Sequence, residues 1–286
     1  MSTPFTEQQE SPRAAATRPE RVTCLPLASL QVNGPDASRF LQGQLTNDLN
    51  HLDEKTPLIA AVCTPDGKLV TIASLQRINE DTLRLITYRE HLNLLHERLA
   101  RFRIRVKADI TVEDLHWATS LTSQATALWP LDTALVPLPA GDDGASDEAF
   151  AHLRLARLAT HLPSDAPPDL LVAGVPTLVA TGVSFTKGCY VGQELVARTD
   201  SRHARPPASL FVQRYSPLSL EALLHLPTPP LPLTAASGDL AGEVRALLLE
   251  DTTVVVSGWV KRRFGDQSGL MIDARPSTAI PVALAP

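Results

Sequence analysis

The sequence predicts an α+β protein in which helices pack on mostly antiparallel sheets and the C-terminal part forms a small β-barrel or sandwich. Over residues 25–113 the hydrophobic spacing switches between strand-like and helix-like periods in the order β-α-β-β-β-α-β. Turns rich in Gly, Pro, Asn and Asp join successive strands directly, which favours antiparallel neighbours. Toward the C-terminus, four short strand-like stretches follow one another with turns between them.

Composition excludes several classes of protein. The 286 residues include 26 Lys plus Arg and 31 Asp plus Glu, which gives a formal net charge of −5. Proteins that coat nucleic acids carry strongly basic faces, and aromatic residues, which stack on bases, make up only 5% of this chain. We therefore expect no strong direct binding of nucleic acid. No apolar run approaches the roughly 18 residues of a membrane span, so we expect no membrane partner.

The cysteines indicate a reducing compartment and no metal site. Cys24, Cys63 and Cys189 lack any CxxC spacing, so the chain alone cannot supply four thiolates to zinc or to an iron–sulfur cluster. Residues 1–21 mix Arg with Glu and lack an apolar core, unlike a secretory signal or an acid-poor transit peptide. We interpret them as a disordered tail of a cytoplasmic protein.

The N-terminal domain, residues 22–114, begins with a strand, a turn and a helix. The apolar run 27–32 predicts the strand, and a Gly-Pro-Asp turn at 34–36 suits a helix start. The helix is indicated by apolar residues three or four positions apart, namely Phe40, Leu41, Leu45 and Leu49. Next, strands at 57–63 and 69–78 flank Pro65-Asp66-Gly67-Lys68, where proline presets φ and glycine accepts a positive φ, so they form a hairpin.

A strand, a helix and a further strand complete this domain. A turn at 79–81 leads into a strand at 83–88, and leucines between 92 and 102 mark one face of an amphipathic helix. From 103 to 108, Arg and Lys alternate with apolar residues, which predicts a strand with one basic face. We interpret that face as solvated, and a patch for a polyglutamate tail, RNA or an acidic partner is the alternative.

A central domain at 115–206 and a C-terminal domain at 207–286 follow. The centre is weakly patterned up to a linker at 137–144, after which Ser146 caps a helix expected to run to about His161. In the C-terminal domain a proline-rich stretch at 227–232 interrupts the strands. The four expected strands are 210–215, 243–249, 253–260 and 270–274.

The densest group of unusual residues is Ser-Phe-Thr-Lys-Gly-Cys-Tyr-Val-Gly-Gln-Glu at 184–194. Gly188 and Gly192 bracket Cys189, and glycines permit backbone conformations that expose a thiol or admit another chain closely. The charge of Lys187 favours the thiolate form of the cysteine. A lone cysteine is more often a small core residue, and from the residues alone that interpretation stays open.

Residues 187–194 resemble the full signature of the YgfZ family of folate-binding, iron–sulfur-assembly proteins, which are relatives of the aminomethyltransferase (T-protein) of the glycine cleavage system. Two further segments agree with this resemblance. Residues 32–48 resemble the family's N-terminal strand and helix, and residues 63–68 are similar to its hairpin turn. The resemblance covers residues 25–205 well and the C-terminal barrel loosely.

The resemblance implies a T-protein/YgfZ-like folate-binding fold, in which the N-terminal and central parts form a cleft of folate size and the C-terminal barrel caps it. It implies an accessory protein for iron–sulfur client proteins, including radical enzymes that modify tRNA, with Cys189 as the functional thiol and tetrahydrofolate as the bound pterin. The other residues expected at the site are Lys187, Gly188, Tyr190, Gly192, Gln193, Glu194, Arg198, Gln42, Gln44, Asn47 and Asp48.

Three departures from the family's pattern bear on activity. The hairpin continues through Thr71 where the aminomethyltransferase has an acidic pair, the pterin-binding carboxylate corresponds to Ala159, and the stretch 115–146 is shorter than in the family. A general acid or base must be titratable, so these departures disfavour the first alternative, a folate-dependent one-carbon transferase. The second alternative is a folate-independent thiol redox or cluster-transfer protein, and the third is a purely structural loop.

Overall fold

The fold is known from a computed structural model that describes residues 22–53, 57–120, 128, 130–138, 147–201, 206–215, 228–250, 253–265 and 270–272. The predicted tail at 1–21 and the helix cap at Ser146 lie outside these ranges. Within the described ranges, the helices are all too short or too polar to cross a membrane.

The N-terminal part is built on a five-stranded antiparallel sheet with the order β3-β4-β5-β2-β6. Helix α1 precedes β3 and helix α2 precedes β6, so the chain follows the predicted order β-α-β-β-β-α-β. Gly67 in the hairpin turn has a φ of +74°, as its place after proline and aspartate predicts. The elements are β2 (Leu27–Asn33), α1 (Ala37–Gln42), β3 (Leu58–Cys63), β4 (Leu69–Asn79), β5 (Thr82–Tyr88), α2 (Leu92–Phe102) and β6 (Asp109–Glu113).

Both faces of this sheet are buried, because side chains alternate between two cores along each strand. In β2, Leu30 and Val32 pack into the core that also holds the apolar side chains of α1 and α2. Leu27 of the same strand points into a second core, shared with Trp117 and Leu162 of the central part. The N-terminal and central parts therefore fold around a common core.

Helix α1 is shorter than predicted. It ends at Gln42, and Leu45 pairs with Val62 in an isolated bridge. The reason is that polar side chains bind neighbouring backbone in place of a helical hydrogen bond: Thr46 Oγ1 donates to Gly182 O and accepts from Ala61 N. Residues 49–51 form only a short 3-10 helix.

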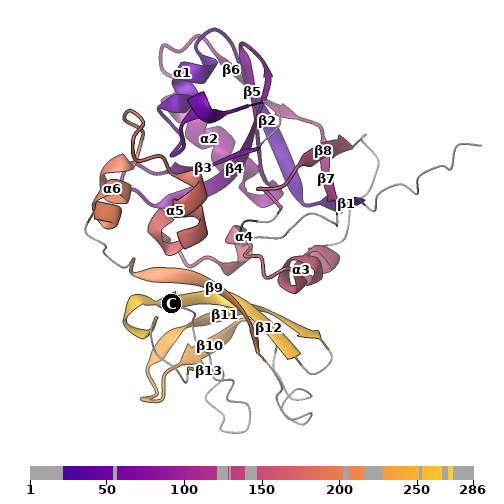
Figure 1. Ribbon diagram of the computed structural model, residues 1–286, viewed down its shortest axis with the longest axis vertical. Helices are drawn as coiled ribbons and strands as arrows, with labels where there is room; N and C mark the ends of the chain where they lie inside the picture. Colours follow the sequence, from indigo (N-terminus) through magenta and orange to yellow (C-terminus); the bar gives the residue numbers. More distant parts are fainter. Residues whose placement is uncertain are drawn as a thin grey trace, which may run out of the picture.

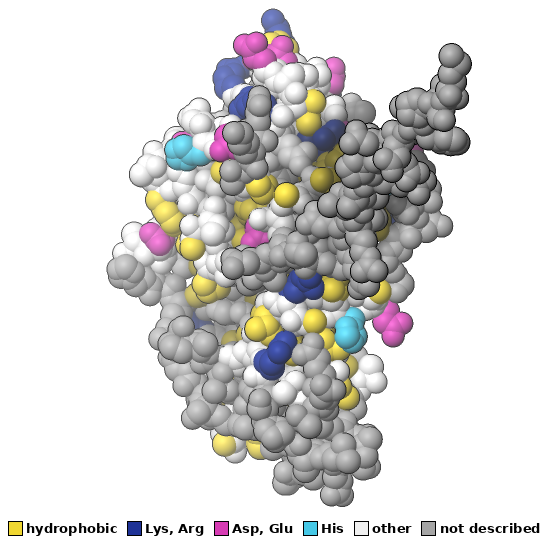
Figure 2. Space-filling view, turned by 45° about the vertical axis from the view of Figure 1, so that its right-hand side comes forward, with side chains coloured by type: hydrophobic (Ala, Val, Ile, Leu, Met, Phe, Trp, Pro, Cys, Tyr) yellow, Lys and Arg dark blue, Asp and Glu magenta, His cyan; other side chains and the backbone are white. Residues whose placement is uncertain are grey.

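The predicted basic strand at 103–108 is wrong. This segment is a turn, and the strand β6 starts afterwards at Asp109. Arg105 has a φ of +58°, and the backbone N–H of Lys107 donates to the carboxylate of Asp36, which bends the chain against the turn at 34–36. The basic side chains are exposed, in agreement with a solvated surface. On the face shown in Figure 2, Lys and Arg side chains lie among Asp and Glu side chains at the upper end.

The central part contributes one small sheet and most of the remaining helices. Strand β1 (Val22–Leu25), which the sequence did not predict, joins β7 (His116–Ser120) and β8 (Leu135–Leu138) in the order β1-β7-β8. The helices are α3 (Asp147–Ala156), α4 (Leu162–Asp165), α5 (Pro176–Gly182) and α6 (Gln193–Ser201). The helix predicted to reach His161 ends at Ala156, because Leu158 adopts a left-handed φ of +54° and reverses the chain.

The C-terminal part is a five-stranded antiparallel sheet with the order β13-β10-β11-β12-β9. Four strands lie where the sequence predicts them, and β10 is an additional strand in the proline-rich stretch. The first and last strands of this order are not paired with each other among the described residues, so a closed barrel is not confirmed. The strands are β9 (Ala208–Tyr215), β10 (Leu231–Thr234), β11 (Leu240–Glu250), β12 (Thr253–Lys261) and β13 (Met271–Ile272).

The molecule has three tiers along its long axis. Figure 1 shows the N-terminal sheet with α1 and α2 in the upper part and the C-terminal sheet in the lower part, with α3, α4 and α5 between them. Helices α3 and α4 contact β11 and β12, while α5 packs on β3. The loop between α5 and α6 therefore lies beside the N-terminal sheet, at one side of the molecule.

Candidate functional site

Residues 183–192, called the signature loop below, connect α5 to α6 and carry most of the family signature. Cys189 is exposed in this loop. Gly192 has a φ of +89°, and a Cβ there would lie 2.8 Å from both Cys63 Cβ and Thr64 O, so only glycine fits. Gly188 differs, because a Cβ there would meet no atom within 4 Å. One side of the loop is thus pressed against the end of β3, and the cysteine side is open.

Lys187 is buried, with only 8% of the residue exposed. Its ammonium donates to three main-chain carbonyls, Gln42 O at 2.7 Å, Leu45 O at 2.9 Å and Asn47 O at 2.6 Å. Burial lowers the pKa of Lys187 to about 8, and the negative charge of Asp48 opposes this shift. Because an ammonium has three N–H donors and all three are used, Lys187 has none left for the thiol of the cysteine two residues on.

Tyr190, which follows Cys189 in the chain, is also buried. It is 7% exposed, its ring lies 5.4 Å from the ammonium of Lys187, and burial raises its pKa. The N–H of Val191 donates to Gly43 O at 3.1 Å, and the N–H of Gln193 donates to Tyr190 O at 3.2 Å. The predicted residues from 187 to 193 are therefore brought together, although their polar groups are used in holding the loop.

The polar residues predicted near the first helix also lie here, and they too bind protein groups. Asn47 donates to Ile59 O, and the amide of Gln42 donates to Asp48 Oδ1 at 2.8 Å. Asp48 caps the following 3-10 helix through Asn50 N, and that hydrogen bond lowers the pKa of its carboxyl. Gln44 accepts from Arg98 at 3.1 Å, and Arg98 also binds the carbonyl of the residue at the end of β3.

Glu194 and Arg198 lie on the exposed side of α6 and form an ion pair with each other, one turn apart. Their side chains are 84% and 50% exposed, so they are accessible to a partner and line no buried cleft.

The three cysteines, all within the described residues, differ sharply in environment. Cys63 is buried, and burial raises the pKa of its thiol to about 12, so it stays protonated. Cys24 is half-buried in β1, and Cys189 is exposed. Of the three, Cys189 is the exposed cysteine.

A second candidate site is a pocket of about 260 Å³ where the three tiers meet. It lies in the position that the resemblance assigns to a folate cleft. Its lining comes from the hairpin strand, from the segment around α4 and from β11, and consists of Leu69, Val70, His91, Leu162, Pro163, Ala166, Pro167, Pro168, Asp169, Leu170 and Arg245.

This pocket does not fit a pterin. A pterin's N–H donors are bound best by a carboxylate, and the one carboxylate in the lining, Asp169, is 69% exposed and paired with Lys68 at 3.0 Å. Thr71, at the place of the family's acidic pair, is buried and bonded to Thr87 and His91. Ala159 is fully buried among apolar side chains. The described lining thus lacks the group that would recognise the cofactor.

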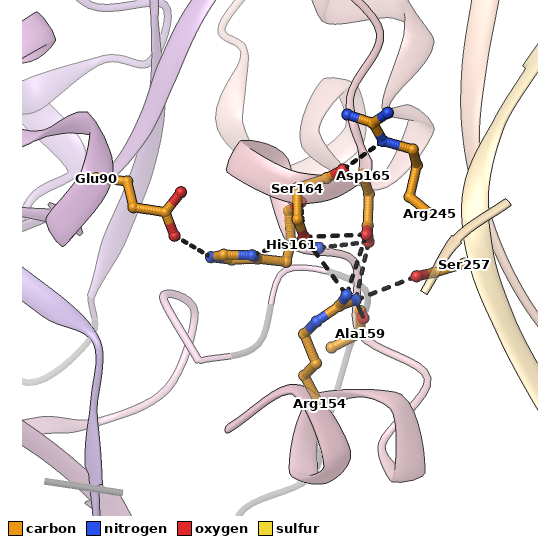
Figure 3. A network of polar contacts seen from close by, with 8 residues as sticks. All are labelled: Glu90, Arg154, Ala159, His161, Ser164, Asp165, Arg245 and Ser257. Carbon is orange, nitrogen blue, oxygen red and sulfur yellow. Dashed lines mark hydrogen bonds and ion pairs between the residues drawn. The ribbon is translucent and has the colours of Figure 1, made fainter. Parts of the chain in front are cut away.

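Beside the pocket lies a buried polar network that the sequence analysis missed (Figure 3). Arg154 of α3 forms a bidentate ion pair with Asp165 of α4 at 2.9 and 3.0 Å, and both side chains are at least 98% buried. Arg154 also donates to Ser257 of β12 at 3.2 Å. The N–H of His161 donates to the same carboxylate at 2.8 Å, so Asp165 has no free oxygen for a ligand. The network joins the centre to the C-terminal sheet, and no motif in the sequence signals it.

Comparison with known proteins identifies the family of this chain. "tRNA-modifying protein YgfZ" of Edwardsiella ictaluri is 30% identical over 225 residues, which cover 64% of this chain and 68% of that protein. The chain belongs to the YgfZ family. Another protein of the same name, from Colwellia psychrerythraea, is 27% identical over 209 residues, and the chain spans 64% of its length. No protein-family profile matches the chain.

A human protein is similar to this chain in sequence, and a bacterial enzyme is similar to it in fold. "Iron-sulfur cluster assembly factor IBA57, mitochondrial" of Homo sapiens is 29% identical over 266 residues, which cover 76% of this chain and 71% of that protein. The crystal structure of the glycine cleavage system aminomethyltransferase T from Bartonella henselae superposes with a TM-score of 0.65, covering 92% of this chain at 12% identity. This YgfZ-family chain therefore has the aminomethyltransferase fold, as predicted.

Proposed function

We propose that this chain is an accessory protein for iron–sulfur proteins, including enzymes that modify tRNA, and that it acts by binding its clients through Cys189. The observation that carries the proposal is the exposed thiol of Cys189, held between the buried residues Lys187 and Tyr190. A thiol fixed on a protruding loop is accessible to a second protein, whereas a buried thiol is inert. The names of the relatives, a tRNA-modifying protein and an iron–sulfur cluster assembly factor, support the client class.

Binding explains the loop better than turnover does. Among the described residues, no side chain forms a hydrogen bond with the Cys189 thiol. The three N–H groups of the Lys187 ammonium all donate to main-chain carbonyls. General acid–base catalysis at the thiol would need a second titratable group within hydrogen-bond reach of it. A one-carbon transferase is further disfavoured by Thr71, whose hydroxyl is bound to Thr87 and His91.

A thiol redox protein that forms an internal disulfide is also disfavoured. Such a protein needs a second accessible cysteine close to the first. Cys63 is buried beneath Gly192, and Cys24 is half-buried in β1, which pairs with β7. The thiol of Cys189 is therefore offered to another molecule.

The proposal is tested by complementation of a bacterial strain that lacks its own YgfZ protein. We expect the wild-type chain to restore the activity of iron–sulfur enzymes and the level of modified nucleosides in tRNA, measured by mass spectrometry. Cys189→Ala should lose most of this activity at equal protein level, because the accessible thiol is gone. Cys24→Ala serves as the matched control and should retain it. Full restoration by Cys189→Ala would contradict the proposal.

A further inference from the structure

Two ties hold the signature loop to one turn of the N-terminal part, one on each side of Cys189. Before the cysteine, the ammonium of Lys187 binds the carbonyls of residues 42, 45 and 47 at 2.6 to 2.9 Å. After it, the N–H of Val191 donates to Gly43 O at 3.1 Å. All four acceptors belong to the end of α1 and the turn that follows it. The exposed thiol therefore lies in a short segment, 187–191, whose two ends are bound to the same turn at 42–47.

The three carbonyls around the ammonium form a site for a cation. Carbonyl oxygens that converge on one point repel one another, and a buried carbonyl without a donor is unfavourable. Gln42 is the last residue of α1, so its carbonyl has no hydrogen-bond partner within the helix. Lys187 supplies the positive charge from the signature loop itself. Without this ammonium the loop would lose one of its two ties, and the turn at 42–47 would lose its cation.

We infer that Lys187 is a positioning residue, whose buried ammonium fixes the place and orientation of Cys189 by filling a cage of three main-chain carbonyls. This assignment differs from the sequence-based expectations for Lys187, which were cofactor binding and stabilisation of the thiolate. It rests on the proposed function only in taking Cys189 as the working thiol. It requires nothing of Glu194 and Arg198, which are exposed and paired with each other.

The test is the mobility of a nitroxide spin label attached to Cys189, in a Cys24→Ser background, with Cys63 buried. In the otherwise wild-type protein we expect an electron paramagnetic resonance spectrum with a slow-motion component. Lys187→Met keeps the unbranched stem of the side chain and removes only the ammonium, and its label should move severalfold faster. Lys68→Met is the matched control, because Lys68 is paired with Asp66 and Asp169 at the surface and its loss should leave the spectrum unchanged.

Chemical rescue separates the cage from a general loss of packing. In Lys187→Ala, n-propylammonium ions should enter the vacated cage and restore the slow component. Tetramethylammonium ions have no N–H donor and should not restore it. Rescue by both ions equally, or an unchanged spectrum in Lys187→Met, would overturn the inference.

A measurement on the unmodified protein keeps the inference testable if the variants fail to fold. Nitrogen-15 NMR should detect a slowly exchanging ammonium for Lys187, whereas the ammonium of the exposed Lys107 exchanges fast. Absence of a protected ammonium would refute the cage. These experiments involve no client, so they are independent of complementation: if Cys189→Ala is silent in cells while Lys187 still controls the label, the proposed function fails and the positioning role stands.

Discussion

At the scale of single residues, burial decides which ionisable groups carry charge. The ring of His161 lies 4.7 Å from that of Tyr88 and 5.3 Å from that of Phe150, in edge-to-face contacts. Burial lowers its pKa from 6.5 to about 3, and the charges of Arg154 and His91 add to the shift. Its Nε2 has no hydrogen-bond partner in the described structure and lies 3.9 Å from the exposed carboxylate of Glu90. Figure 3 shows the ring between Glu90 and Ser164. With its pKa lowered to about 3, the imidazole is neutral at pH 7 in the folded protein.

The shift predicts a loss of stability in acid. The pKa of His161 is lower in the folded protein than in the unfolded chain. The contribution of the neutral imidazole to the free energy of unfolding is therefore complete above pH 6.5 and decreases as the pH drops toward about 3. The free energy of unfolding should decrease by up to about 1.4 kcal/mol per pH unit in this window. Urea titrations of wild type and His161→Gln at several pH values measure the free energy of unfolding. The variant should show the smaller decrease per pH unit. His152→Gln, which changes an exposed histidine of α3, should keep the wild-type slope, and equal slopes for wild type and His161→Gln would refute the assignment.

At the scale of elements, tertiary contacts decide where helices and strands end. The strand expected at 103–108 is a turn, because the backbone around Lys107 binds Asp36 and the left-handed Arg105 bends the chain. Periodicity alone contains no information about such a distant partner. In the signature loop, by contrast, the sequence alone indicates the unusual backbone through two glycines, and the fold requires glycine at one of them, Gly192.

Gly192 and Gly188 should respond differently to the same substitution. In Gly192→Ala the alanine has to adopt the left-handed φ of +89°, and its methyl group lies 2.8 Å from Cys63 Cβ. We therefore expect a loss of roughly 2–5 kcal/mol in the free energy of unfolding. Gly188→Ala meets no atom within 4 Å and should change stability by less than about 0.5 kcal/mol. Denaturant unfolding measures both, and a similar loss in the two variants would contradict the packing of the loop.

At the scale of the whole molecule, the three tiers meet at the central pocket and at the network beside it. Arg154 and Asp165 use their charges on each other, and Arg154 reaches Ser257 in the C-terminal sheet. Arg245 of β11 donates to Ser164 O at 2.9 Å. The ion pair joins α3 to α4 within the central part, and the hydrogen bond from Arg154 to Ser257 connects that pair to β12. Removing one partner of the buried pair would leave an uncompensated charge. Both oxygens of the Asp165 carboxylate are bound within the protein, so that carboxylate is unavailable to a ligand.

The central pocket should therefore not bind tetrahydrofolate. Calorimetric titration of the reduced protein is expected to show no saturable heat, in the wild type and in Cys189→Ala alike, because the lining has no buried free carboxylate. Arg245→Ala, which alters the pocket wall, locates any binding that does occur. Saturable binding that Arg245→Ala abolishes would contradict this reading of the pocket and support the folate expectation drawn from the family resemblance.

The sequence by itself determined the α+β class, the order of elements over residues 27–102, the hairpin turn and the family, because these depend on local periodicity, turn chemistry and a contiguous signature. It did not determine the ends of α1 and α3, the strand β10 or the arginine network. Those features depend on contacts between residues far apart in the chain. The role we infer for Lys187 is of this second kind, since its three acceptors lie about 140 residues away in the sequence. A side chain's use is decided by what the fold places around it.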